Sequence, residues 1–339
     1  MEENRVLTAQ EVAREADLTQ PLPQKRRINR AKLQENIWGW IFVAALFIGT
    51  TVFTYFSLVL SVMISFTNYD AYFMTPFWEN LTNIHSGGWY YWYKFMFTAE
   101  VGGVGGEAQY VWSTLWTTVV YLIGIPIGMI LSLAIAVLMT RDIKFTGTFR
   151  VVYYIPTVAS TVSVALMWSN LFGNGGLFST MFNVNFITSA SAGMQRFCLI
   201  MLTTWKGLGG TIVLFVAGLN GVNASYREAA DIDGANAWQI FWRITMPQLY
   251  PTIFYVLVTS VIGGMQIFAE PDLIFGGYPV PTGQGSDGTQ WNTPFVGYIF
   301  GNFEQGEWAH ASALGIVLAV IIFLLTLIQF GLDSRRDKV

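Results

Sequence analysis

Charged side chains are scarce in this chain. Only 12% of its 339 residues are Asp, Glu, Lys or Arg, whereas soluble domains carry about 25%. So little charge does not suit a surface that faces water, and the composition excludes an ordinary soluble domain. The formal net charge of −3 also gives no basic face for binding nucleic acid.

Cysteine and histidine are almost absent. Cys198 has no second cysteine to form an internal disulfide, and its apolar surroundings indicate a small buried hydrophobic residue. His85 and His310 are the only histidines, and no His, Cys or carboxylate cluster has the spacing of a metal site. The sequence therefore predicts no metal site and gives little basis for catalysis.

The phosphate-binding motif G-x-x-x-x-G-K-[ST] is missing, and no Gly-Lys pair occurs anywhere in the chain. We therefore expect no ATP bound by a P-loop and no other cofactor. Hydrolysis of ATP, if the protein depends on it, must belong to another subunit.

Hydrophobic residues, in contrast, make up 53% of the chain and aromatic residues 16%, which suits lipid contact and the bilayer interfaces. A helix needs about 20 apolar residues to cross the hydrocarbon layer. Six stretches qualify, at residues 37–66, 111–139, 151–172, 197–218, 249–269 and 311–332. The sequence thus predicts an all-α integral membrane protein with six transmembrane helices.

Basic residues indicate how the spans are oriented. With the N-terminus in the cytoplasm, fifteen Lys and Arg residues fall inside, only Lys94 and Arg196 fall outside, and Lys206 lies within a span. The positive-inside rule favours this placement, which puts both termini in the cytoplasm. The expected division is a cytoplasmic tail over 1–36, a six-helix permease domain over 37–332 and a second cytoplasmic tail over 333–339.

Two outer segments are long, at residues 67–110 and 270–309. The first is rich in Trp and contains a glycine-rich run at 102–106, and the second is rich in Gly and Pro. Long loops of this kind are often functional or mobile. They are expected either to meet an external partner or to serve as plain connections.

The cytoplasmic segment between the fourth and fifth spans carries the most specific pattern. Ser225 followed by Glu228 is typical of a capping box that starts a helix, and Asn236 followed by Gln239 predicts a second start. Gly234 between them allows a sharp bend. The pattern predicts two short helices that meet at an angle.

The first of these helices would present small residues, which permit close approach of another surface. The second carries three aromatic residues and is expected to lie at the membrane interface. These residues are Trp238, Phe241 and Trp242. We expect Pro247 to end the second helix before the fifth span begins.

This segment resembles the EAA loop of the permease subunits of bacterial ATP-binding cassette importers. The match runs Glu228-Ala229-Ala230, three residues, Gly234, nine residues, Ile244, one residue and Met246-Pro247, and only Met246 replaces the family leucine. The wider form from Tyr226 to Ala235 is similar to the carbohydrate-uptake branch that includes the maltose and glycerol-3-phosphate transporters. The resemblance extends over about residues 37–332.

The resemblance implies the type I importer permease fold in the bacterial inner membrane and a sugar or related carbohydrate as substrate. It implies a second permease subunit in a heterodimer, two cytoplasmic subunits that bind ATP and magnesium, and an extracytoplasmic solute-binding protein. The residues expected to couple to the ATPase are Glu228, Ala229, Ala230, Asp231 and Gly234. In the alternative, Glu228 only caps its own helix.

Lys206 is the one full charge deep in a predicted span, and such a residue is a functional candidate by default. In a sugar pathway, Trp205 would stack on a pyranose face and Lys206 would donate to hydroxyl groups. Gly207 and Gly210 would leave room for the substrate.

Gln266 in the fifth span and Glu270 at its outer end are further candidates for the pathway. In the alternative, Lys206 extends toward the interface and the glycines only pack helices. A secondary transporter would need coupling-ion carboxylates at membrane depth or inverted repeats, and an intramembrane enzyme would need a catalytic constellation. The sequence contains none of these features.

Overall fold

The computed structural model describes residues 30–69, 76–98, 100–101, 104–105, 107–140, 146–184, 186–187, 192–275 and 292–336. The chain divides into two units, residues 1–59 and 60–339, which we describe separately. Most of the predicted N-terminal tail and residues 276–291 of the second outer segment lie outside the described residues, as does part of the glycine-rich run at 102–106.

The first unit contains α2 (Arg30–Thr50), the π-helix η1 (Thr51–Phe56) and the start of α3 (Ser57–Ile64). Residues 36–64 form one candidate span of 29 residues. Large apolar side chains cover its surface, among them Phe42, Leu46 and Phe53. Such a surface suits lipid rather than water, as predicted for the first span.

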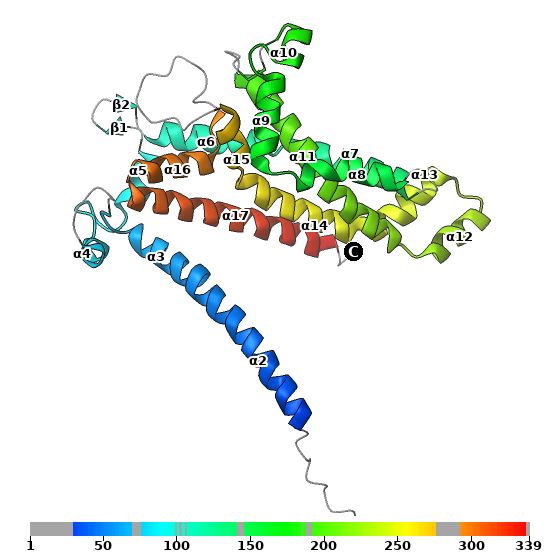
Figure 1. The fold of residues 1–339 in the computed structure, drawn as a ribbon, viewed down its shortest axis with the longest axis horizontal. Coiled ribbons are helices and arrows are strands. Elements are labelled where there is room, and N and C mark those ends of the chain that lie inside the picture. The colour runs from blue at the N-terminus through cyan, green and yellow to red at the C-terminus, as the bar shows by residue number, and fades with distance from the viewer. Residues whose placement is uncertain are drawn as a thin grey trace, which may run out of the picture. The chain divides into compact units, whose positions relative to one another are not determined.

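In the described residues, the second unit is mainly helical and contains one antiparallel strand pair, β1 (Glu100–Val101) with β2 (Val104–Gly105). Figure 1 shows α12 and α13 at one end of this unit and α5 and α16 near the other. The remaining helices are α4 (Phe77–Thr82), α5 (Tyr91–Phe97), α6 (Glu107–Tyr121), α7 (Gly124–Met139), α8 (Thr146–Val158), α9 (Thr161–Phe172), α10 (Leu177–Phe182), α11 (Ala192–Asn220), α12 (Ala224–Ile232), α13 (Ala237–Ile240), the π-helix η2 (Phe241–Thr245), α14 (Met246–Met265), α15 (Ala269–Phe275), α16 (Phe295–Glu304) and α17 (Trp308–Arg336).

Five helices in the described residues are long and apolar enough to cross a membrane, and one bent pair makes a sixth candidate. This agrees with the predicted number of spans. The second span, residues 107–139, contains a two-residue turn at Leu122 and Ile123, between α6 and α7. Pro126 has no N–H to donate to the carbonyl of Leu122, which accepts from Ile125 instead.

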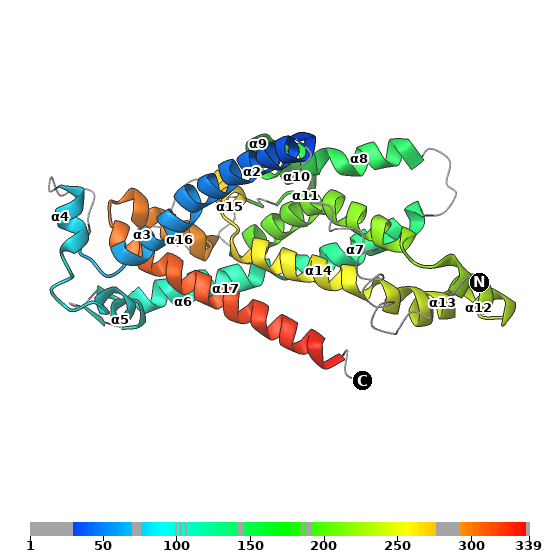
Figure 2. The ribbon, with the colours of Figure 1, turned by 90° about the horizontal axis from the view of Figure 1, so that it is seen from below.

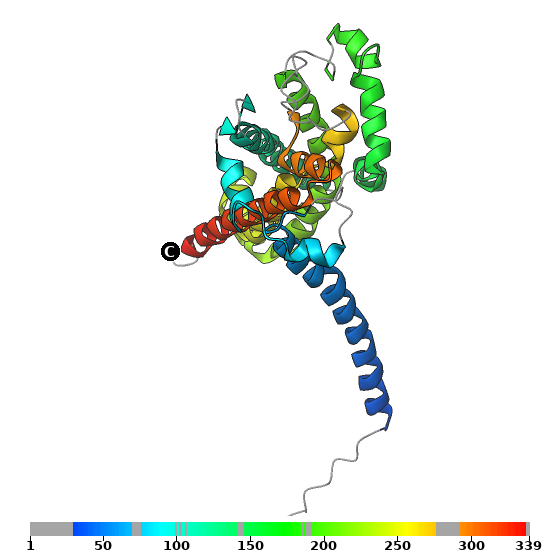
Figure 3. The same ribbon diagram turned by 90° about the vertical axis from the view of Figure 1, so that its left-hand side faces the viewer.

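The third predicted span, 151–172, is not one straight helix. The chain turns by 97° between the segments 147–158 and 161–182. Figures 1 and 3 show α9 rising steeply from α8 instead of continuing along it. The helix stops because Ser160 has an extended backbone, with φ −56° and ψ 135°. The periodicity of apolar residues did not reveal this bend.

The fifth span also differs from the prediction. Pro247 does not end the preceding helix, because residues 237–265 form one candidate span of 29 residues. The π-helix η2 accommodates the proline, since its wider turn lets the N–H of Met246 donate to Phe241. At the other end, the span stops at Met265 and α15 begins as a separate helix. Figure 2 shows α17 running alongside α14.

Both long outer segments contain helices that the sequence analysis did not predict. α5 and α16 pack with α6 and α17 around Met96, Val111 and Phe295, which are all fully buried. A polar cluster lies beside this core. Oε1 of Glu107 accepts from the hydroxyl of Tyr298 at 2.5 Å and lies 2.7 Å from Nε2 of His310.

α11 lies at the centre of the second unit, where α7 and α8 pack against it. Glycine permits the closest of these contacts. A Cβ at Gly209 would lie 2.4 Å from Oγ1 of Thr157 and 2.6 Å from the carbonyl oxygen of Tyr153. Small residues of this kind let helix backbones approach closely in membranes.

We predict that Gly209→Val will destabilise the second unit, because α8 must move away from α11. Overpacking of this kind costs about 1–3 kcal/mol. The measurement is the thermal stability and yield of the purified protein. Gly315→Ala is the control, since a Cβ there meets nothing within 4 Å. Equal stability of the two variants would contradict this account of the packing.

Candidate functional site

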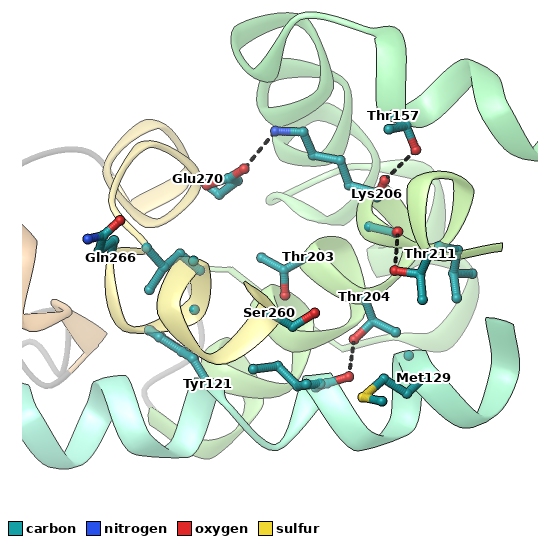
Figure 4. Close-up of a pocket in the computed structure, with 18 of the residues that line it drawn as sticks. Tyr121, Met129, Thr157, Thr203, Thr204, Lys206, Thr211, Ser260, Gln266 and Glu270 are labelled. Atoms are coloured by element: carbon teal, nitrogen blue, oxygen red, sulfur yellow. Dashed lines mark hydrogen bonds and ion pairs between the residues drawn. The ribbon is translucent and has the colours of Figure 1, made fainter. Parts of the chain in front are cut away.

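A cavity of about 650 Å³ opens between α7, α11, α14 and α15. Among glycines and apolar residues, its lining includes hydroxyl and amide side chains, as Figure 4 shows. They are Tyr121, Ser132, Thr157, Thr203, Thr204, Thr211, Ser260 and Gln266. Lys206 and Glu270 add one cation and one anion to the lining. The hydroxyls of Thr157, Thr203 and Thr204 donate to backbone carbonyls, so they offer acceptor oxygens to the cavity, and the lining is nearly neutral in charge.

Lys206 makes three hydrogen bonds with residues around the cavity. Its Nζ donates to Oε1 of Glu270 at 2.7 Å and to Oγ1 of Thr161 at 2.6 Å. Its backbone carbonyl accepts from the hydroxyl of Thr157 at 2.9 Å. The Lys206 and Glu270 side chains are 19% and 17% exposed, so both remain accessible from the cavity. The lysine is thus paired within the protein and does not extend alone toward lipid.

The six predicted pathway residues divide into two groups. Lys206, Gly207, Gln266 and Glu270 line the cavity. Trp205 and Gly210 are not among the lining residues. Trp205 instead packs on Trp168, with ring centroids 5.8 Å apart. A Cβ on Gly210 would lie 3.7 Å from Cγ2 of Thr157.

The sequence analysis missed Thr157 and Thr161. They lie on either side of the bend between α8 and α9, and both bind Lys206. The signal available was weak: two threonines four residues apart, close to Pro156 in an apolar stretch. Their partner is more than forty positions away in the chain, so periodicity alone did not identify it.

The predicted coupling segment forms α12, a bend and α13. The expected cap at Ser225 is wrong, because Asn223 is the N-cap and its Oδ1 accepts from the N–H of Ser225 at 3.0 Å. Asparagine competes well for this position since its short side chain reaches the first free N–H groups. The second cap is confirmed, with Asn236 and Gln239 forming a capping box.

Gly234 makes the bend. Its φ of +78° lies in the left-handed region that side chains disfavour, and the N–H of Ala235 donates back to the carbonyl of Ala230 at 3.0 Å. The preceding helix α12 has no buried residue. Glu228, Ala229 and Asp231 are all exposed on it, and Ile232 is 87% exposed. This helix therefore presents a small, partly apolar surface.

Comparison with known proteins places this architecture in a family. Residues 124–338 match the family described as "Binding-protein-dependent transport system inner membrane component". The chain is 33% identical over 314 residues to the "Probable ABC transporter permease protein YesP" of Bacillus subtilis, covering 90% of this chain and 93% of the relative. It is 26% identical to the "Multiple sugar-binding transport system permease protein MsmF" of Streptococcus mutans, covering 90% and 98%.

Solved structures share the fold. A chain of a bacterial alginate ABC transporter, solved in complex with an alginate pentasaccharide-bound periplasmic protein, matches with a TM-score of 0.69 and 18% identity, covering 91% of this chain and 98% of that one. A second alginate importer structure matches with a TM-score of 0.67 and 22% identity, covering 90% and 99%. The chain thus belongs to the inner membrane components of binding-protein-dependent transport systems, which are multi-pass permease subunits of bacterial ABC importers and not enzymes.

Proposed function

We propose that this permease carries a sugar or oligosaccharide and that the cavity at Lys206 is part of its pathway. The observation that carries the proposal is the cavity itself, with its threonine, serine, tyrosine and amide lining. Sugars are neutral and rich in hydroxyl groups, so they need many hydrogen-bond partners and little net charge. The names of the relatives support this class, because they include arabinooligosaccharide, lactose and maltodextrin permeases.

Lys206 and Glu270 give the cavity its strongest hydrogen-bonding groups. An ammonium has three N–H donors. Among the described residues, two of them donate, one to Glu270 and one to Thr161. The third N–H is left for a substrate hydroxyl, and Oε2 of Glu270 accepts a second one. Gln266, which is exposed at the end of α14, adds an amide on the same side.

The exposed helix α12 is the proposed docking element for a cytoplasmic ATPase subunit. A nine-residue helix without buried residues gains little from packing within this chain. A partner that covers Ala229 and Ala230 would bury its small face, and Glu228 and Asp231 would supply charge. Gly234 then sets the angle at which α12 leaves the membrane helices.

The complete importer in this proposal contains this chain, a second permease in a heterodimer, two ATP-binding subunits and an extracytoplasmic solute-binding protein. ATP and magnesium are bound by the ATPase subunits. The alginate transporter structure supports the binding-protein partner, since that transporter was solved in complex with a periplasmic protein.

We predict that Lys206→Ala will weaken apparent sugar affinity or change substrate preference in uptake assays. Hydrogen bonds to charged groups contribute about 1.5–3 kcal/mol, which corresponds to roughly a tenfold or larger change in affinity. Uptake is measured across a range of substrate concentrations, together with the yield of assembled complex. Lys94→Ala is the matched control, because Lys94 is an exposed lysine on α5.

Unchanged affinity, rate and selectivity in Lys206→Ala at normal yield would remove this residue from the pathway. A loss of yield alone would indicate a structural role, because the substitution leaves the Glu270 carboxylate without its partner.

We predict that Glu228→Lys and Gly234→Pro will each abolish uptake and reduce co-purification of the ATPase. The first reverses the charge of the docking face. The second fixes φ near −65°, whereas Gly234 has a φ of +78°. Insertion of the chain in the membrane should be normal, as fractionation would establish.

The control for charge reversal is Glu304→Lys, at the end of α16 and far along the chain from α12. It should retain the ATPase. Normal uptake and normal ATPase recovery in both test variants would show that α12 is not the coupling element.

A further inference from the structure

The cavity carries its two charges as one pair. Lys206 and Glu270 are the charged groups among the described residues that line it, and Nζ of the lysine lies 2.7 Å from Oε1 of the glutamate. The ammonium also donates to Oγ1 of Thr161 at 2.6 Å, so two of its three N–H groups are in use. A ligand in the cavity therefore meets a cation that a carboxylate already balances.

The threonines of the lining offer acceptor oxygens to the cavity. Four of them are half-buried, and each donates its hydroxyl proton to a backbone carbonyl at 2.9–3.4 Å. They are Thr157, Thr203, Thr204 and Thr211, all labelled in Figure 4. A hydroxyl has one proton and two lone pairs. Because the proton is bound to a carbonyl, the lone pairs are what these side chains present to a ligand.

A lining of this kind favours ligands that donate hydrogen bonds. The hydroxyl groups of a sugar carry protons that the threonine oxygens and Oε2 of Glu270 can accept. An ionised carboxylate has oxygens that only accept, so it would face the threonine oxygens without a proton between them. At Lys206 it would also lie beside Glu270, and juxtaposed like charges weaken binding. The cavity therefore penalises an acidic ligand in two ways.

Charges close to the lining along the chain do not alter this balance. α15 carries Asp272 two residues after Glu270, and α11 carries Arg196, whose Nη2 donates to Oγ1 of Thr117 at 3.1 Å. They are one charge of each sign, and neither residue lines the cavity. Glu270 is thus the group that makes the lining neutral.

The place of Glu270 is held by apolar packing. Its helix, α15, contributes Ile274 to the buried cluster that contains Trp168 of α9 and Leu202 of α11. A change of Glu270 to glutamine leaves that cluster intact and keeps the size of the side chain. The charge of the cavity can therefore be changed while the helix stays in position.

We propose that Glu270 sets the charge specificity of this permease: because it neutralises Lys206, the cavity accepts uncharged saccharides and excludes acidic ones such as uronates. The fold by itself does not decide this property, since a structure that shares it belongs to an importer of the acidic polysaccharide alginate. The inference rests on the proposed pathway role of the cavity. It adds the substrate class and names the residue that selects it.

The test measures how the cavity treats a small anion and a small neutral probe. A reporter cysteine replaces Ser260, which lines the cavity, in a Cys198→Ala background. The assembled importer is placed in lipid nanodiscs without substrate. Labelling rates of this chain are measured with sulfonatoethyl and hydroxyethyl methanethiosulfonate. The ratio of the anionic to the neutral rate is divided by the same ratio for a free thiol, so that changes in access common to both reagents cancel.

We expect the parent ratio to lie at or below that of the free thiol. Glu270→Gln should raise it about tenfold or more, because a cleft with charge of one sign concentrates counter-ions. The rise should shrink at high salt, which screens charge. Adding Lys206→Ala to Glu270→Gln should restore the parent ratio. Glu304→Gln is the matched control, since this carboxylate is exposed on α16 and does not line the cavity.

A parent ratio about tenfold above that of the free thiol would overturn the inference, because the cavity would then attract anions despite Glu270. An unchanged ratio in Glu270→Gln at normal yield would do the same, as would uptake of trigalacturonate by the parent importer. Normal sugar affinity in Lys206→Ala together with the expected labelling ratios has a different meaning. The cavity would then be neutral as inferred, and its pathway role would fail.

Discussion

A charge at membrane depth has to be compensated, and the compensation of Lys206 organises the region around the cavity. An uncompensated ammonium in hydrocarbon is expensive. Here a carboxylate from α15 and a hydroxyl from α9 surround it, at 2.7 and 2.6 Å. The same lysine contacts both sides of the bend in the third span and joins α15 to α11, beside the apolar cluster that α9, α11 and α15 share. The compensation of one charge therefore links three elements that line or border the cavity.

Close helix packing makes that arrangement possible. α8 lies near enough to α11 for Thr157 to reach the carbonyl of Lys206 because Gly209 has no Cβ. Gly124 plays the same part between α7 and α11, where a Cβ would lie 2.9 Å from Oγ1 of Thr204. These glycines pack helices, whereas Gly207 faces open space at the cavity. The glycines around Lys206 thus divide between helix packing at Gly209 and open cavity space at Gly207.

The proposed coupling loop and the cavity are joined by one stretch of helix. Residues 237–265 run as a single candidate span from the bend at Gly234 to Gln266 at the cavity. The π-helical turn at 241–245 keeps this stretch continuous past Pro247. A helix is stiff along its axis, so under the proposed docking of an ATPase subunit a displacement of α12 would be transmitted along this helix to the cavity wall that carries Ser260.

Composition and local patterns by themselves determined that this is a helical membrane protein with up to six spans, where most of the spans fall, and which loop resembles the EAA pattern. Those properties depend on apolar run length and on short-range motifs such as Gly234 and the Asn236–Gln239 box. The structure was needed to reveal the 97° bend, the separate helix α15 and the ion pair between Lys206 and Glu270. The bend and the break before α15 lie within apolar stretches, where the backbone conformation of single residues such as Ser160 decides them. The Lys206–Glu270 pair joins residues 64 positions apart, and periodicity along one segment carries no information about such distant partners. For the same reason the core position of Trp205, which the sequence placed in the pathway, followed only from its packing on Trp168.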